Sequence, residues 1–178
     1  MRKLGKRASL CGMLTPAVAF AAIGASIALS PWFSWARNAL SDLGALGSPV
    51  WPIFNTGLLV AGLLASCFSY GLLRQARRGL DKAGSAILLI GSISLALIGL
   101  LPEDTGIGIS EFLSPRGKRR ASSGLLASAL GGTSLLTWAT WALLSPPLGI
   151  AVPELAAAVL ISAALIALSL RMADAFRS

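Results

Sequence analysis

The sequence predicts an all-α membrane protein, a single domain of 178 residues with five transmembrane helices and a short interfacial helix. Three observations predict this fold class. Five apolar stretches of 19 to 24 residues alternate with short charged loops, and about 20 helical residues span the ~30 Å hydrocarbon core. Charged residues make up 12% of the chain, against about 25% in soluble domains. The mean hydropathy is +0.77. The expected spans are residues 10–29, 50–73, 83–101, 121–144 and 148–170.

The first span follows a basic N-terminus and therefore resembles a signal peptide. Ala19-Phe20-Ala21 has the small-x-small form of a cleavage site. Because apolar sequence continues to Leu29, we expect this helix to be retained rather than cleaved.

The loop between the first two spans is rich in tryptophan and in polar side chains. Trp32 and Trp35 suit the headgroup level, so we expect an interfacial helix over residues 32–43. Asn38, Ser41 and Asp42 follow within it. These residue types bond to nearby backbone N–H groups, which favours a structural turn over the alternative, a polar functional site.

Basic residues at the ends of the apolar stretches predict the orientation. The positive-inside rule places the N-terminus in the cytoplasm of a multi-pass plasma-membrane protein. Five simple crossings divide Lys and Arg almost evenly, eight inside and seven outside. A return to the cytoplasm before Arg116 would give fourteen and one.

The chain between Asp104 and Arg116 decides between these arrangements. Its 11 residues reach roughly half of a crossing as a helix. We therefore expect five crossings, with residues 105–115 re-entrant, interfacial or outside. The last helix would then begin on the cytoplasmic side, whereas in a six-crossing pattern Glu154 would lie with Asp42.

Seven residues form the candidate polar site. Glu103 and Asp104 follow the third span, and Asn55 lies in the second span where it could face them. Carboxylates and a carboxamide can coordinate Ca²⁺ or Mg²⁺, but solvated loop charges explain the pattern equally, and we assign no metal and no cofactor. Glu154 suits the N-terminus of the last helix. The site comprises Asn38, Ser41, Asp42, Asn55, Glu103, Asp104 and Glu154.

Composition also bears on partners. The net charge of +8 lies beside membrane segments, so we expect the lipid bilayer as partner and no nucleic acid. The chain has no histidine, the commonest general base and zinc ligand, and its two cysteines lack metal-ligand spacing. Small residues recur at spacing four, which predicts close helix packing within the bundle and leaves open a homo-oligomer or a membrane partner.

Four motifs in order carry a family resemblance. They are Asn38-Ala-Leu-Ser-Asp-Leu-Gly44, Phe54-Asn-Thr-Gly-Leu58, Leu101-Pro-Glu-Asp-Thr-Gly106 and Gly149-Ile-Ala-Val-Pro-Glu154. From Ala36 onward the chain resembles the prokaryotic membrane-protein family known as domain of unknown function 998, which is distantly similar to the Frag1/DRAM/Sfk1 group of trafficking and lipid-organising proteins. The resemblance implies six helices, and this chain lacks the family's fourth helix and the histidine that commonly precedes it.

Three functions remain open at the sequence level. The absence of mid-span charges favours a non-enzymatic accessory, lipid-organising or partner-binding bundle. A small ion or solute transporter is the first alternative. A metal-assisted lipid hydrolase at the membrane surface is the second.

Overall fold

The computed structural model describes residues 2–100 and 151–174, which form long helices and one short 3₁₀ helix. In chain order the elements are α1 (Arg2–Ala28), η1 (Ser41–Gly44), α2 (Trp51–Gln75), α3 (Gly79–Leu100) and α6 (Ala151–Asp174). The four long helices are each long and apolar enough to cross a membrane. They contain four of the five expected spans almost entirely, so the described part of the chain is a membrane helix bundle.

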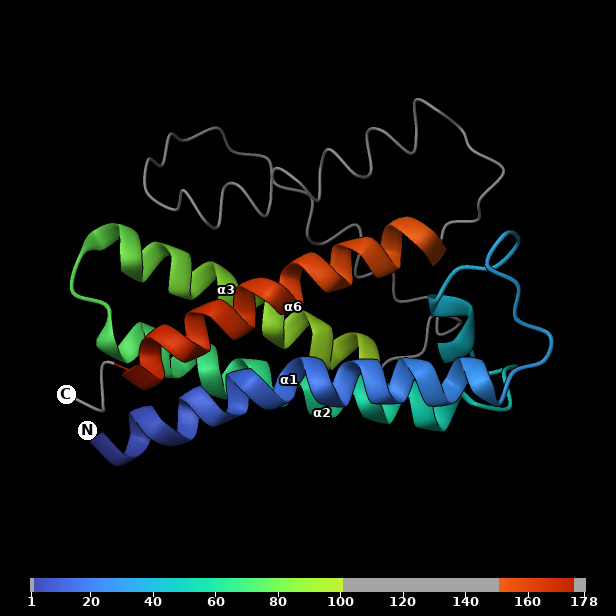
Figure 1. The fold of residues 1–178 in the computed structure, drawn as a ribbon, viewed down its shortest axis with the longest axis horizontal. Helices are drawn as coiled ribbons and strands as arrows, with labels where there is room; N and C mark the ends of the chain where they lie inside the picture. The colour runs from blue at the N-terminus through green and yellow to red at the C-terminus, as the bar shows by residue number, and fades with distance from the viewer. Residues whose placement is uncertain (1, 101–150, 175–178) are drawn as a thin grey trace, which may run out of the picture.

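The helices run side by side, as Figure 1 shows. α2 packs against both α1 and α3, and α6 packs against α1. The start of α1 and the end of α6 lie at one end of the bundle, here called the termini end. The opposite end, here called the loop end, holds residues 29–50 with η1 and the first turn of α6.

Small residues set the spacing between these helices. A Cβ atom on Gly57 would collide with Ala22 of α1, and one on Gly62 would collide with the backbone of Ala96 in α3. Such positions let helix backbones approach closely in lipid, where dispersion replaces the hydrophobic effect as the attractive force. The predicted role of small residues in internal packing therefore applies to α1, α2 and α3.

Serine hydroxyls join the helices across these close contacts. Ser9 Oγ donates to the carbonyl oxygen of Ser169 at 2.7 Å, which ties α1 to α6. The hydroxyls of Ser69 and Ser92 lie 3.2 Å apart and tie α2 to α3. Interhelical bonds of this kind contribute on average about 0.6 kcal/mol each in membrane proteins.

The expected interfacial helix over residues 32–43 is wrong. In this segment only η1 is helical, and residues 31–40 form turns. The Oδ1 atom of Asn38 accepts the backbone N–H of Ser34 at 3.0 Å, and the N–H of Arg37 turns back to the Ser34 carbonyl. Asn and Ser side chains offer the backbone alternatives to helical hydrogen bonds, and here those alternatives prevail.

The direction of α6 overturns the five-crossing arrangement. Five simple crossings would end the chain at the end opposite to its start. Instead, α6 begins at the loop end and finishes beside the start of α1, where Met172 packs against Ala8. The expected fourth span at 121–144, the segment 105–115 and the basic cluster at 116–120 lie outside the described residues.

Candidate functional site: the polar cap

Two polar side chains organise the loop between α1 and α2. Asp42 Oδ2 accepts hydrogen bonds from Asn38 Nδ2 and from the backbone N–H of Ala39, each at 3.0 Å. Asn38 Oδ1 accepts the Ser34 N–H in turn. Ser41, also expected in the site, is half-buried and begins η1. The loop therefore uses its own carboxylate and carboxamide to satisfy backbone donors that no regular helix pairs.

Glu154 joins this loop to α6. Its Oε2 atom accepts the backbone N–H of Leu40 at 2.6 Å, across 114 residues of sequence. Beside it, the N–H of Ala151 donates to the carbonyl oxygen of Asn38 at 3.3 Å. A carboxylate in the first turn also interacts favourably with the positive end of the helix dipole. The first turn of α6 is therefore bonded to the loop in both directions.

Asn55 connects α2 to the loop. It lies in the second turn of α2, is 4% exposed, and donates through Nδ2 to the carbonyl oxygen of Gly44 at 2.9 Å. A Cβ atom on Gly44 would lie 2.5 Å from Asn55 Oδ1 and 2.9 Å from the Phe54 ring. The close approach of loop and helix at this point therefore requires glycine.

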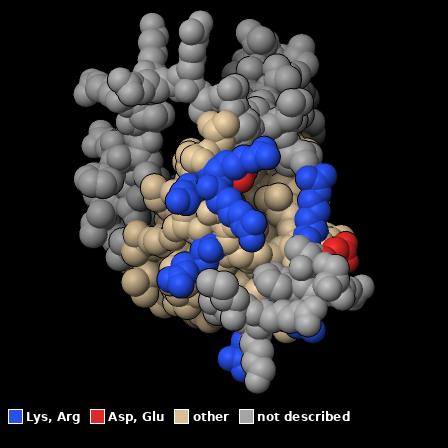
Figure 2. Space-filling model, turned by 90° about the vertical axis from the view of Figure 1, so that its left-hand side faces the viewer, with Lys and Arg blue, Asp and Glu red and all other residues tan. Residues whose placement is uncertain are grey.

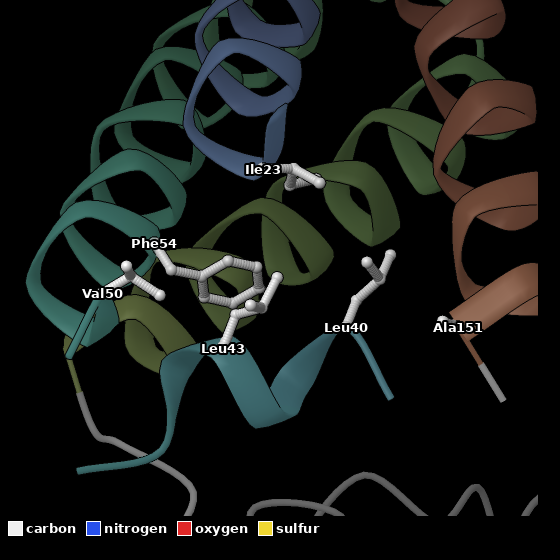
Figure 3. Packing of buried hydrophobic residues seen from close by; sticks show 6 residues of the cluster. All are labelled: Ile23, Leu40, Leu43, Val50, Phe54 and Ala151. Carbon is white, nitrogen blue, oxygen red and sulfur yellow. The ribbon is translucent and has the colours of Figure 1, made fainter. Parts of the chain in front are cut away.

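An apolar cluster lies next to these hydrogen bonds, on the side of the loop that faces the helices. Figure 3 shows its side chains lying between α1, the loop, α2 and α6, with Leu43 next to Phe54. Leu43 is fully buried, and Leu40 contributes its side chain while its N–H bonds to Glu154. The members of the cluster are Ile23, Leu40, Leu43, Val50, Phe54 and Ala151.

The structure thus brings together most of the expected polar site. Asn38 and Asp42 bond to each other, and Glu154 bonds to the backbone of the same loop at Leu40; these three residues are here called the polar cap. Asn55 bonds to the same loop at the Gly44 carbonyl oxygen. The expectation from five crossings, that Glu154 faces the opposite side from Asp42, is wrong. Glu103 and Asp104 lie outside the described residues.

Residues 13–115 match the family model described as a protein of unknown function, DUF998. The match covers more than half of the chain. This protein belongs to the DUF998 family. No curated protein and no solved structure matches it. The matched segment includes the first three sequence motifs, whereas Glu154 lies beyond it.

In this DUF998 protein the carboxylates of the polar cap make hydrogen bonds within the chain. Within the described ranges no group of three His, Cys, Asp or Glu side chains could hold a metal ion. Asp42 Oδ2 and Glu154 Oε2 already accept backbone N–H groups of their own chain. Both carboxylates therefore serve the architecture of the loop.

Sequence reasoning missed two serines near the loop end, Ser26 in α1 and Ser30 just beyond its last residue, Ala28. The hydroxyls of Ser26 and Ser30 are buried, and in the part of the DUF998 chain described here neither has a hydrogen-bond partner. Polar side chains at the end of an apolar span are the signal that could have singled them out. The sequence gives no sign of the partner of Glu154, because that partner is a backbone N–H and every residue except proline has one.

Proposed function

We propose that this chain is a multi-pass plasma-membrane protein with a non-enzymatic role, a bundle that organises lipid or binds a membrane partner. The observation that carries the proposal is the use of the polar cap. Its carboxylates and its carboxamide bond to backbone groups and to one another and so stabilise the loop.

The positions of the charged residues support the same proposal. In the described helices every Asp, Glu, Lys and Arg lies within about two turns of a helix end, such as Arg74 in α2 and Arg171 in α6. Transport pathways usually carry ionisable groups or broken helices near the middle of the membrane. The groove between α1 and α2, about 500 Å³ in volume, is shallow and mostly apolar and opens on the outside of the bundle.

Reconstitution into proteoliposomes tests the proposal. We expect no flux of monovalent or divalent cations or of small neutral solutes above that of empty vesicles. We also expect no hydrolysis of labelled phospholipids, with or without divalent metal. Reproducible turnover that disappears in Asp42→Asn would contradict a purely structural cap and would require a different function.

A small transporter is the second candidate, favoured by one observation. The buried hydroxyls of Ser26 and Ser30 lack partners among the described residues. An unpaired buried hydroxyl is costly, and a passing polar solute could satisfy it. Flux that falls in the double variant Ser26→Ala/Ser30→Ala, while the protein remains folded, would favour this candidate over the first.

We propose further that the termini end faces the cytoplasm. Seven described Lys and Arg side chains lie at or beside this end and only Arg37 lies at the other, which is the bias of the positive-inside rule. Single cysteines at Asp174 and Arg37, in a chain without its native cysteines, test the orientation. A membrane-impermeant maleimide added to intact cells should label position 37 and spare position 174. The opposite pattern would reverse the orientation.

A further inference from the structure

Three helices meet at one level of the termini end. A Cβ atom on Gly71 of α2 would collide with Ala8 of α1 and would lie 3.3 Å from the Cε atom of Met172 in α6. One turn deeper, Ser9 of α1 bonds to Ser169 of α6. The start of α1 and the ends of α2 and α6 therefore lie at the same level along the bundle.

Each of these helices carries an exposed arginine beside that meeting point. Arg7 precedes Ala8, Arg171 precedes Met172, and Arg74 lies one turn beyond Gly71. The α2–α3 turn adds more exposed cations within a few residues. The whole set, here called the basic collar, is Lys6, Arg7, Arg74, Arg77, Arg78, Lys82 and Arg171.

The basic collar dominates the charge of this face. Figure 2 shows Lys and Arg side chains distributed around the termini end, with acidic side chains in two places. The described acids there are Asp81 and Asp174, so seven cations and two anions leave a net charge of +5. Such a concentration of positive charge attracts anions strongly at a membrane surface.

Tyr70 indicates the depth at which the collar lies. Its side chain is 46% exposed, on the outside of α2. Arg74 Nη1 lies 3.5 Å from the Tyr70 hydroxyl, and its guanidinium carbon lies 6.0 Å from the ring centroid. Tyrosine prefers the headgroup region, and an adjacent arginine extends toward the phosphates. We therefore expect Arg74 to lie at the level of the lipid phosphate groups.

Exposed apolar side chains adjoin the collar on the same helices. Leu10 and Met13 lie on α1 within two turns of Arg7, and Leu80 lies on α3 beside Lys82. A soluble anion would gain only from the charges. A phospholipid would gain from both, because its phosphate meets arginine while its acyl chains cover the apolar residues.

We propose that the basic collar is a binding surface for anionic phospholipid, which it selects over zwitterionic phospholipid through phosphate contacts made mainly by arginine. Arginine suits this role because its planar fork can bond two phosphate oxygens at once. Phosphatidylglycerol carries a net negative charge, whereas in phosphatidylcholine the choline cation neutralises the phosphate. The inference deepens the proposed function by naming a lipid class, and it rests on that function only for its membrane setting.

Competition between two lipids measures the selectivity. The full chain is purified in a neutral detergent and mixed with equal amounts of phosphatidylglycerol and phosphatidylcholine of identical acyl chains. Native mass spectrometry then gives the ratio of bound lipids. Each cation near the phosphate plane contributes about fivefold, so Arg74→Gln/Arg77→Gln/Arg78→Gln should lower the ratio on the order of 100-fold at low salt.

Matched variants separate charge from geometry and from folding. Arg37→Gln removes one cation at the loop end and should leave the ratio unchanged. The triple lysine variant at positions 74, 77 and 78 keeps the charge and loses the planar fork, so its ratio should lie between those of the wild type and the glutamine variant. Elution as a single species with unchanged helix content verifies that each variant is folded.

Three outcomes would overturn the inference. They are a wild-type ratio near one, a ratio unaffected by the glutamine variant, or complete displacement of bound phosphatidylglycerol by excess inorganic phosphate, which would indicate a site for soluble anions. The flux experiments remain separate from this test. Transport by a protein that still selects phosphatidylglycerol would refute the accessory role alone, and absent flux with no selectivity would refute the lipid surface alone.

Discussion

Replacement of Glu154 by alanine is the most direct test of the polar cap. The substitution removes the carboxylate oxygen that lies 2.6 Å from the Leu40 nitrogen. The Leu40 N–H then loses this acceptor, and the loop loses one of its hydrogen bonds to α6. Alanine is a good helix former, so α6 itself should persist. The loss should therefore report on the contact between the loop and the helix, not on helix formation.

The expected cost follows from the geometry. A hydrogen bond to an ionised group contributes about 1.5–3 kcal/mol, and a carboxylate in the first turn of a helix adds about 0.3–1 kcal/mol. Glu154 is only half-buried, so solvent screens both terms. We expect Glu154→Ala to lower the free energy of unfolding by about 2 kcal/mol, and Glu154→Gln, which keeps a neutral acceptor, by about 1 kcal/mol.

Two assays report on this change. Thermal unfolding in detergent should show a midpoint lower by about 4–8 °C for Glu154→Ala, because each kcal/mol corresponds to about 2–4 °C in a chain of this size. Amide hydrogen exchange should show faster exchange at Leu40, while the amides in the middle of α2 keep their protection. The exchange measurement identifies the hydrogen bond itself.

Asp174→Ala supplies the control, because this exposed carboxylate ends the same helix at the termini end. It should change stability by less than about 0.5 kcal/mol, as is usual for surface positions. The reasoning is refuted if Glu154→Ala is as stable as the control variant and the Leu40 amide exchanges at the wild-type rate.

Three further predictions concern the packing of the bundle. Gly62→Val should destabilise the protein by about 3 kcal/mol or prevent folding, because a Cβ atom at position 62 meets the α3 backbone. Gly91→Ala is the control, since nothing lies within 4 Å of the added Cβ atom, and it should be neutral or slightly stabilising. Thermal unfolding measures both variants. Asn55→Ala should lower the free energy of unfolding by about 1–3 kcal/mol, since it leaves a buried carbonyl unpaired, and denaturant titration measures the loss. A Cβ atom on Gly12 of α1 would lie 2.8 Å from the Phe68 ring of α2, so the neighbouring residues Cys11 and Cys67, both free thiols, lie at the same level of the two helices. A membrane-permeant thiol oxidant should therefore form an intramolecular disulfide, seen as a mobility shift on non-reducing gels and absent in Cys67→Ser.

The long helices were predictable from the sequence because burial in lipid imposes one requirement on every residue of a span. About 20 apolar residues in a row are needed to cross the hydrocarbon core, and few other structures use them. The ends were predicted less accurately: α2 begins one residue from its predicted start at 50, but α1 begins at Arg2 and α3 at Gly79, ahead of the predicted starts at 10 and 83. The direction of α6 was less accessible, because loop length and loop charge pointed to different arrangements. The distribution of Lys and Arg favoured the direction that α6 has in the structure, whereas the loop length favoured the opposite one.

The loop between α1 and α2 could be predicted only in part. Tryptophans and an amphipathic pattern suggested an interfacial helix, but side-chain bonds from Asn38 and Asp42 to the backbone favour turns instead. The favoured interpretation of Asn38, Ser41 and Asp42 as residues of a structural turn agrees with the local hydrogen bonds. The bond from Leu40 to Glu154 was beyond sequence reasoning, because it joins a side chain to a backbone group whose position depends on the whole bundle.

The bond between Leu40 and Glu154 also has a consequence for biosynthesis. The ribosome makes the loop long before it makes α6, since 114 residues separate the two partners. During that interval α1, α2 and α3 can pair through their small-residue contacts, while the Leu40 N–H has no carboxylate to meet. The loop end is therefore completed only when the last helix inserts. A nascent chain halted before Ala151 should present this loop to proteases that the finished protein resists.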